Sequence, residues 1–200
     1  EEITLIDTVR YNGLEGGRKY SVTGTLVDKE TGKALLDDAG KEITASNEFT
    51  AEKPNGTIEI TFKFSGVSLA GKTTVAFEHM YTDGKEVAVH ADLKDEKQTE
   101  YFPSVHTTAT SNDTEDHVVG ANEKVTITDN VALKALKLGT EYTLSGILMD
   151  ATTGKPIVID GNTIIARRTF TADAHEMNVP LTYELNASQL AGTTTVVFED

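Results

Sequence analysis

The chain has 200 residues, of which 18 are basic and 32 are acidic, so its formal net charge is −14. This charge argues against nucleic acid and anionic membrane surfaces as partners, since both attract clustered Lys and Arg. No apolar run is long enough to cross a bilayer and none has the form of a signal peptide, so we expect no membrane insertion of this chain. Cysteine is absent, which excludes disulfides, thiolate metal sites and cysteine nucleophiles.

The opening segment of the chain occurs twice. TLIDTVRYNGLEGGRKYSVTGTLVDKETGKAL, which begins at Thr4, matches TITDNVALKALKLGTEYTLSGILMDATTGKPI, which begins at Thr126. At the start of the match the offset is 122 residues (4 to 126), and by the Phe-Glu step, at positions 78 and 199, it has fallen to 121. One residue is therefore lost in a loop, which we place at residues 36–48. An internal repeat of this length predicts two tandem domains.

The next segments of each copy have the alternation of half-buried strands. TIEITFKF (57–64) places apolar residues at every second position, and NVPLTYEL (178–185) repeats the pattern. Pro180 falls within the second of these strands and predicts an edge position, because proline cannot donate to a ladder. Short turns such as Pro54-Asn55-Gly56 separate the strands. We expect an all-β fold of two tandem immunoglobulin-like antiparallel β-sandwich domains.

The boundary between the domains is predicted near Pro103, which gives residues 1–103 and 104–200. Residues 81–99 of the first copy have no counterpart in the second, and the segment between 105 and 124 has none ahead of the first. We therefore expect the first domain to lack its first strand and the second domain to lack its last.

Four acidic residues recur at matched positions of the two copies. Asp7 and Asp129 follow alternating runs, where an Asp at a strand end usually caps a turn. Glu78 and Glu199 close the runs TTVAF and TTVVF, which have the composition of buried strands. A carboxylate in that place lies either at the rim or in a desolvated cluster with a raised pKa.

The sequence offers two further kinds of site, a calcium site and a serine nucleophile. Two acidic groups could supply oxygen ligands for calcium, namely His90, Asp92 and Asp95, and Asp113, Glu115 and Asp116. Neither fits the spacing of a calcium-binding loop, and acidic clusters are common in a chain of this charge. No G-x-S-x-G element is present for a serine nucleophile. No cofactor is expected.

The chain resembles the immunoglobulin-like repeats of Gram-positive surface adhesins that carry an intramolecular Thr–Gln ester bond, often called VaFE repeats. The matching segments of the first copy are IDTVRY, YSVTGTLVDKETGKAL, VAFE and HADLKDEKQT. Those of the second copy are ITDNVAL, YTLSGILMDATTGKPI and VVFE. Together they cover nearly the whole chain.

For the first copy, the resemblance implies half of an ester-forming site. Gln98 would supply the acyl part of the ester from its carboxamide. Asp7 and Glu78 would form a carboxyl pair that polarises this amide, and His90 would assist proton transfer from the attacking hydroxyl.

For the second copy, the resemblance implies the other half. Thr107 would be the nucleophile, with Thr108 as the second choice, and Asp129 and Glu199 would be its carboxyl pair. The threonine of the first site and the histidine and glutamine of the second are expected outside this chain.

The resemblance also implies a function. The reaction would release ammonia and occur once per site, so the protein is not expected to be an enzyme. The domains would be stalk repeats of an adhesin outside a Gram-positive bacterium, attached to its cell wall, with neighbouring repeats as partners. No host ligand is indicated. The alternatives are a ligand-binding adhesin module and a pilin-like domain with a Lys–Asn isopeptide bond, and hydroxylamine, which cleaves only esters readily, would separate ester from isopeptide.

Overall fold

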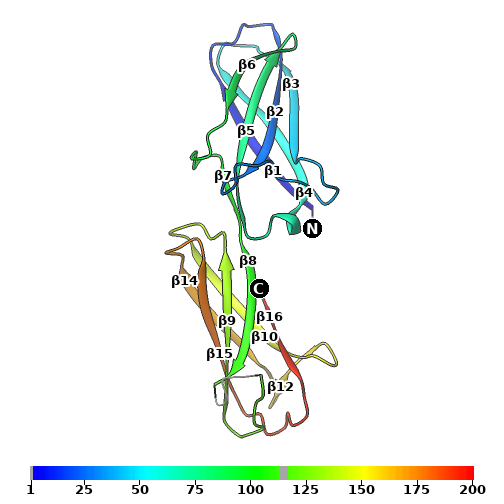
Figure 1. Ribbon diagram of the computed structural model, residues 1–200, viewed down its shortest axis with the longest axis vertical. Helices are drawn as coiled ribbons and strands as arrows, with labels where there is room; N and C mark the ends of the chain where they lie inside the picture. Colours follow the sequence, from blue (N-terminus) through cyan, green and yellow to red (C-terminus); the bar gives the residue numbers. More distant parts are fainter. Residues whose placement is uncertain (1, 113–116) are drawn as a thin grey trace. The chain divides into compact units, whose positions relative to one another are not determined.

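The computed structural model describes residues 2–112 and 117–200 and divides into two compact units, residues 1–102 and 103–200 (Figure 1). We call these units the first and the second domain. Every strand pairing in both domains is antiparallel, which confirms the all-β prediction. Within the described residues, no helix has the length and apolar character that a membrane span requires.

The first domain contains two sheets. In one, β1 (Glu2–Tyr11) pairs with β4 (Gly56–Ser65). The other has the order β3-β2-β5-β6, and β7 also pairs with β5. Its strands are β2 (Lys19–Asp28), β3 (Thr44–Thr50), β5 (Lys72–Thr82), β6 (Lys85–His90) and β7 (Thr99–Phe102). A short 3-10 helix, η1 (Gly66–Leu69), joins β4 to β5.

The core of the first domain lies between its two sheets. Phe62 of β4 is fully buried and belongs to the same apolar cluster as Val22 and Leu26 of β2. Gly24 allows this close packing, since a Cβ atom there would lie 2.7 Å from Cζ of Phe62. The apolar side chains of the alternation predicted for residues 57–64 therefore pack against the opposite sheet.

The second domain also contains two principal sheets. In one, β9 (Val125–Lys134) lies between β15 (Met177–Leu185) and β8 (Ser104–Ser111). In the other, β10 pairs with β11, β14 and β16. These strands are β10 (Glu141–Asp150), β11 (Lys155–Pro156), β14 (Ile165–Thr171) and β16 (Thr195–Glu199), and a small hairpin joins β12 (Val158–Ile159) to β13 (Asn162–Thr163). Pro180 lies in the edge strand β15, as predicted.

The repeated segments fold with the same register in both domains. Gly24 of β2 pairs with Glu78, and Gly146 of β10 pairs with Glu199. Likewise, the pairing partner of Asp7 in β4 and the pairing partner of Asp129 in β15 are equivalent positions of the repeat. The lost residue falls at a hairpin tip, where a bridge joins Leu36 to Glu42 in the first domain and β12 pairs with β13 in the second.

The domains differ at the strands that only one of them has. β8 pairs with the edge of β9 that faces away from β15. No strand in the described part of the chain pairs with the corresponding edge of β1. β6 and β7 occur only in the first domain, where both pair with β5.

The prediction that Asp7 and Asp129 lie at strand ends is wrong. Asp7 lies in the middle of β1 and Asp129 in the middle of β9. Both take an inward position of the alternation, so that Asp129 is fully buried between the apolar residues Ile127 and Val131. The register of these strands, rather than a turn, therefore decides what the two carboxylates contact.

Candidate functional site

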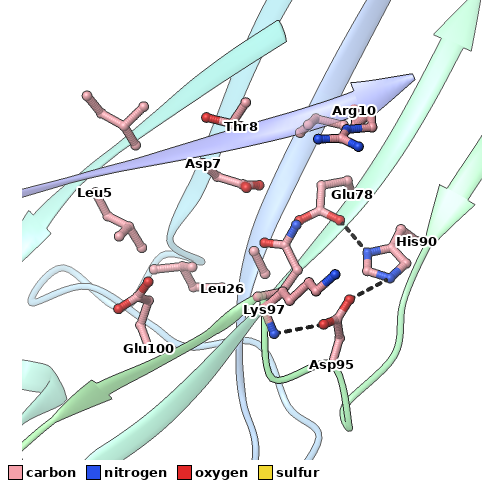
Figure 2. Close-up of a pocket in the computed structure, with 14 residues that line it drawn as sticks. Leu5, Asp7, Thr8, Arg10, Leu26, Glu78, His90, Asp95, Lys97 and Glu100 are labelled. Carbon is pink, nitrogen blue, oxygen red and sulfur yellow. Dashed lines mark hydrogen bonds and ion pairs between the residues drawn. The ribbon is translucent and has the colours of Figure 1, made fainter. Parts of the chain in front are cut away.

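The first-domain site is a cavity of about 550 Å³ beside β1 (Figure 2). Four side chains that the sequence analysis selected line it: Asp7 from β1, Glu78 from β5, His90 from the end of β6, and Gln98 from the segment before β7. These residues are far apart in the chain, and the pairing of β5 with both β6 and β7 brings three of them to one place.

Asp7 and Glu78 form a buried carboxyl pair. Glu78 is 3% exposed, and Oε1 of Glu78 and Oδ2 of Asp7 are both buried where no N–H or O–H group of another described residue donates to them. Burial, and then the hydrogen bond and charge of Asp7, raise the pKa of Glu78 to about 9. Glu78 is therefore protonated at neutral pH, and a proton between the two carboxyl groups satisfies both unpaired oxygens.

His90 contacts the carboxyl pair directly. Its Nδ1 lies 3.0 Å from Oε2 of Glu78, and its Nε2 lies 3.3 Å from Oδ2 of Asp95 (Figure 2). The imidazole is about half exposed, with 47% of its side-chain surface accessible. His90 can therefore exchange protons with the cavity and with solvent.

Asp95 is a site residue that the sequence analysis missed, since it was considered there only as a calcium ligand. A turn fixes its position, because the backbone N–H of Lys97 donates to Oδ1 of Asp95 over 2.8 Å. The signal was its place five residues after His90 and three before Gln98, in a segment with turn composition.

The backbone holds Gln98 beside the carboxyl pair. Its N–H donates to the carbonyl of Asp95 over 3.2 Å, and its carbonyl accepts from the N–H of Ala76 over 3.3 Å. Ala76 is two residues before Glu78 on the same face of β5. Gln98 consequently lines the same cavity as Glu78.

The second-domain site joins a threonine to a carboxyl pair. The hydroxyl of Thr107, on β8, donates to Oδ1 of Asp129, on β9. Oδ2 of Asp129 and Oε1 of Glu199 are buried without a partner, like their counterparts in the first domain. Thr108 pairs opposite Asn130 and is exposed, so it faces away from Asp129.

Glu199 is also shifted towards its protonated form. Burial, and then the hydrogen bond and charge of Asp129, raise the pKa of Glu199 to about 7, although a hydrogen bond with Thr107 acts in the opposite direction. The pair in the second domain thus holds its proton less strongly than the pair in the first, where the pKa of Glu78 is about 9.

The calcium hypothesis gains no support from the described residues, in which no three His, Cys, Asp or Glu side chains are arranged to hold a metal ion. The set of Asp113, Glu115 and Asp116 lies outside the described residues.

These observations define a pair of all-β domains that each bury carboxyl oxygens of an Asp–Glu pair, beside a glutamine in the first domain and a threonine in the second. The family model of the T-Q ester bond containing domain matches residues 1–101 and, separately, residues 103–200. The chain belongs to this family, which confirms the resemblance drawn from the sequence.

Solved structures show weaker similarity. An adhesin from Mobiluncus mulieris that contains intramolecular disulfide, isopeptide and ester bond cross-links matches in two crystal forms, at 13% and 15% identity. The matches cover 90% and 100% of this chain and 68% and 72% of the adhesin, with TM-scores of 0.38 and 0.39. An exo-chitosanase from Amycolatopsis orientalis matches at 17% identity over 96% of this chain and 23% of its own, with a TM-score of 0.31. No curated protein matches.

Proposed function

We propose that each domain is built to form an intramolecular ester bond between a threonine hydroxyl and a glutamine carboxamide. The observation that carries this proposal is the buried Asp–Glu pair, which recurs in both domains with two unpaired oxygens. Gln98 and His90 lie beside the pair in the first domain, and the Thr107 hydroxyl is bound to the pair in the second. The two domains thus display complementary halves of one site.

The shared register of the two domains supports this combination of the halves. Because Asp129 corresponds to Asp7, the place of β8 at the edge of β9 corresponds to the unpaired edge of β1. A strand at that edge could place a threonine hydroxyl on Asp7 in the same way that the Thr107 hydroxyl is bonded to Asp129. Such a threonine would enter the cavity that Gln98 lines.

Once such a threonine is supplied, the groups of the first-domain cavity can carry out the other steps of the reaction. The threonine oxygen attacks Cδ of Gln98 while His90 accepts its proton, since an alcohol is a weak nucleophile without an adjacent base. The protonated carboxyl group of the Asp7–Glu78 pair donates its hydrogen bond to the amide oxygen and stabilises the negative charge that develops there. His90 then gives its proton to the departing nitrogen, the C–N bond breaks and ammonia leaves.

The reaction occurs once at each site. Thr–OH and Gln–CONH₂ become an ester and ammonia, and His90 and the carboxyl pair return to their starting protonation states. The nucleophile and the electrophile both belong to the protein and are consumed, so the function is self-cross-linking and not enzymatic turnover.

Such a bond suits a stalk of tandem domains. A cross-link that closes a loop of about 100 residues would stabilise a domain by roughly 4 to 5 kcal/mol, if the chain-entropy estimate for disulfides applies. It would also slow unfolding under load. We therefore propose that the chain is part of the stalk of an adhesin on the outside of a Gram-positive bacterium, attached to the cell wall, where its partners are neighbouring repeats.

The test supplies the first domain with a strand from the second. Residues 103–124 are joined directly to Ile3, which corresponds to Val125 at the offset of 122 residues (125 and 3). We expect the purified extended chain to be lighter by one ammonia in intact mass spectrometry. Hydroxylamine should open the bond, and tandem mass spectrometry should locate it between Gln98 and the added copy of Thr107.

Three variants of the extended chain serve as controls. Thr→Val at the added copy of Thr107 and Gln98→Ala should each retain the full mass, whereas the same Thr→Val change at the added copy of Thr108 should leave the cross-link intact. An extended chain that folds but keeps its full mass would refute the proposal. A cross-link that survives hydroxylamine would instead indicate an amide.

A further inference from the structure

The two sites differ at one buried position that the repeat makes directly comparable. Phe62 of β4 and Tyr183 of β15 correspond at the later offset of 121 residues (183 and 62). Both side chains are buried and both cross the core to the glycine that pairs with the site glutamate, Gly24 or Gly146. The second domain therefore has a hydroxyl group where the first has an aromatic C–H.

The Tyr183 hydroxyl lies against β10, the strand that pairs with the strand of Glu199. Its oxygen occupies the space that a Cβ atom of Gly146 would need, and Gly146 pairs directly with Glu199. This oxygen is buried without a hydrogen-bond partner, as are Oδ2 of Asp129 and Oε1 of Glu199. Three unpaired polar atoms in one buried region are costly unless they satisfy one another.

We propose that Tyr183 is a positioning residue of the second-domain site and that its hydroxyl donates a hydrogen bond to the Asp129–Glu199 pair. The inference rests on the proposed function, because it assigns the pair a role in ester formation. A donor to the ionised form makes the pair release its proton more readily. The second domain should then cross-link over a lower pH range than the first, which has Phe62 at this position.

The surroundings of the hydroxyl agree with a donor role. β9 contributes Asp129, β16 contributes Glu199, β8 contributes the hydroxyl of Thr107, and β10 contributes Gly146, which has no side chain. Burial, and then the charges of Asp129 and Glu199, raise the pKa of Tyr183 above its ordinary value, so the hydroxyl keeps its proton. A protonated phenol can donate a hydrogen bond to a carboxylate oxygen.

The test is a carboxyl NMR titration of the full chain and of the Tyr183→Phe variant. We expect the substitution to raise the pKa measured at Glu199 by about 1, because the ionised pair loses a donor. Glu78 in the same sample is an internal control and should not change. Tyr142→Phe is a matched control, since the hydroxyl of Tyr142 accepts a hydrogen bond from the N–H of Lys137 in the same domain.

Each outcome separates this inference from the proposed function. An unchanged pKa at Glu199, together with a higher urea midpoint, would show that the hydroxyl is only an unsatisfied buried group, and would overturn the inference. A lower pKa at Glu199 would overturn it as well. If instead Glu78 and Glu199 both titrate as ordinary carboxyl groups in the unsubstituted chain, the proposed function fails, whatever Tyr183 does.

Discussion

The proton affinity of the carboxyl pairs comes from the position of each residue in its strand. Glu78 lies within β5 and is 3% exposed, so its charged form loses most of its hydration. Asp7 reaches the same space from the opposite sheet, and two like charges there would repel each other. The protonated state is therefore built into the fold, although it costs folding free energy at high pH.

This cost predicts how the stability of the first domain depends on pH. The pKa of Glu78 is raised from 4.5 to about 9, so the folded state binds more protons than the unfolded state between these values. The stabilisation is fully present below pH 4.5 and is lost as the pH rises through 9. The free energy of unfolding should fall by up to about 1.4 kcal/mol per pH unit in this window.

Urea unfolding followed through NMR signals of each domain measures this slope. Glu78→Gln should flatten it in the first domain, because Gln does not titrate, and should leave the second domain unchanged. In the second domain the fall should end near pH 7, where Glu199 titrates. A first-domain slope that is equally steep in the Gln variant would mean that other groups cause it.

His90 should govern the rate of ester formation more than its final yield. In the extended chain that carries residues 103–124 ahead of Ile3, His90→Ala removes the group that accepts the threonine proton. We expect the loss of ammonia to slow on the order of 10²-fold or more, as is typical when a general base is removed. The measurement is intact mass against time after refolding. His79→Ala is the matched control, since His79 is bonded to Glu86 on the surface, and an equal effect there would contradict the assignment.

At the scale of strands, alternation predicted the fold well and the site less well. The apolar alternation in residues 57–64 and 178–185 correctly predicted the strands β4 and β15. Pro180 correctly predicted that β15 lies at the edge of its sheet. The aspartates were misplaced because one polar residue in an alternating run suggests its end. Only the strand pairing shows that Asp7 and Asp129 occupy inward positions.

Tertiary contacts account for the site residues that the sequence did not reveal. Asp95 contributes through a turn that carries it to Nε2 of His90, and Tyr183 contributes through a core that lets it reach Gly146. Neither contact leaves a periodic trace in the sequence. His90 and Gln98 were identified only because their segment resembles a known family, and their spacing alone does not predict a shared cavity.

The glycine beneath each core aromatic should be essential to this packing. A Cβ atom at Gly24 would lie 2.7 Å from Cζ of Phe62 and would also collide with Cδ1 of Ile60. Gly24→Ala should therefore lower the free energy of unfolding of the first domain by about 1 to 3 kcal/mol, the usual cost of overpacking. Gly16→Ala is the control, because its Cβ atom would meet only the Glu52 carbonyl at 3.6 Å. Equal urea midpoints for the two variants would contradict this account.

At the scale of the whole chain, the reactive groups are divided between the domains. Gln98 belongs to the first domain, whereas Thr107 is held in the second by a β8 strand that pairs with β9 along all eight of its residues. Thr8 also lines the first cavity, but it lies on the opposite side of β1 from Asp7 (Figure 2). No threonine among the described residues of the first domain is thus bonded to the Asp7–Glu78 pair in the way that Thr107 is bonded to Asp129.

The 200-residue chain by itself should accordingly contain no internal ester bond. Thr107 could reach Gln98 only if β8 left β9 and broke its whole ladder, together with the hydrogen bond to Asp129. Intact mass spectrometry should therefore give the full mass, and denaturing electrophoresis should give a monomer. A monomer lighter by one ammonia would refute this expectation and show that β8 can change domains. A ladder of covalent multimers would show instead that the open edge of β1 accepts β8 from another molecule, as unpaired strand edges are prone to do.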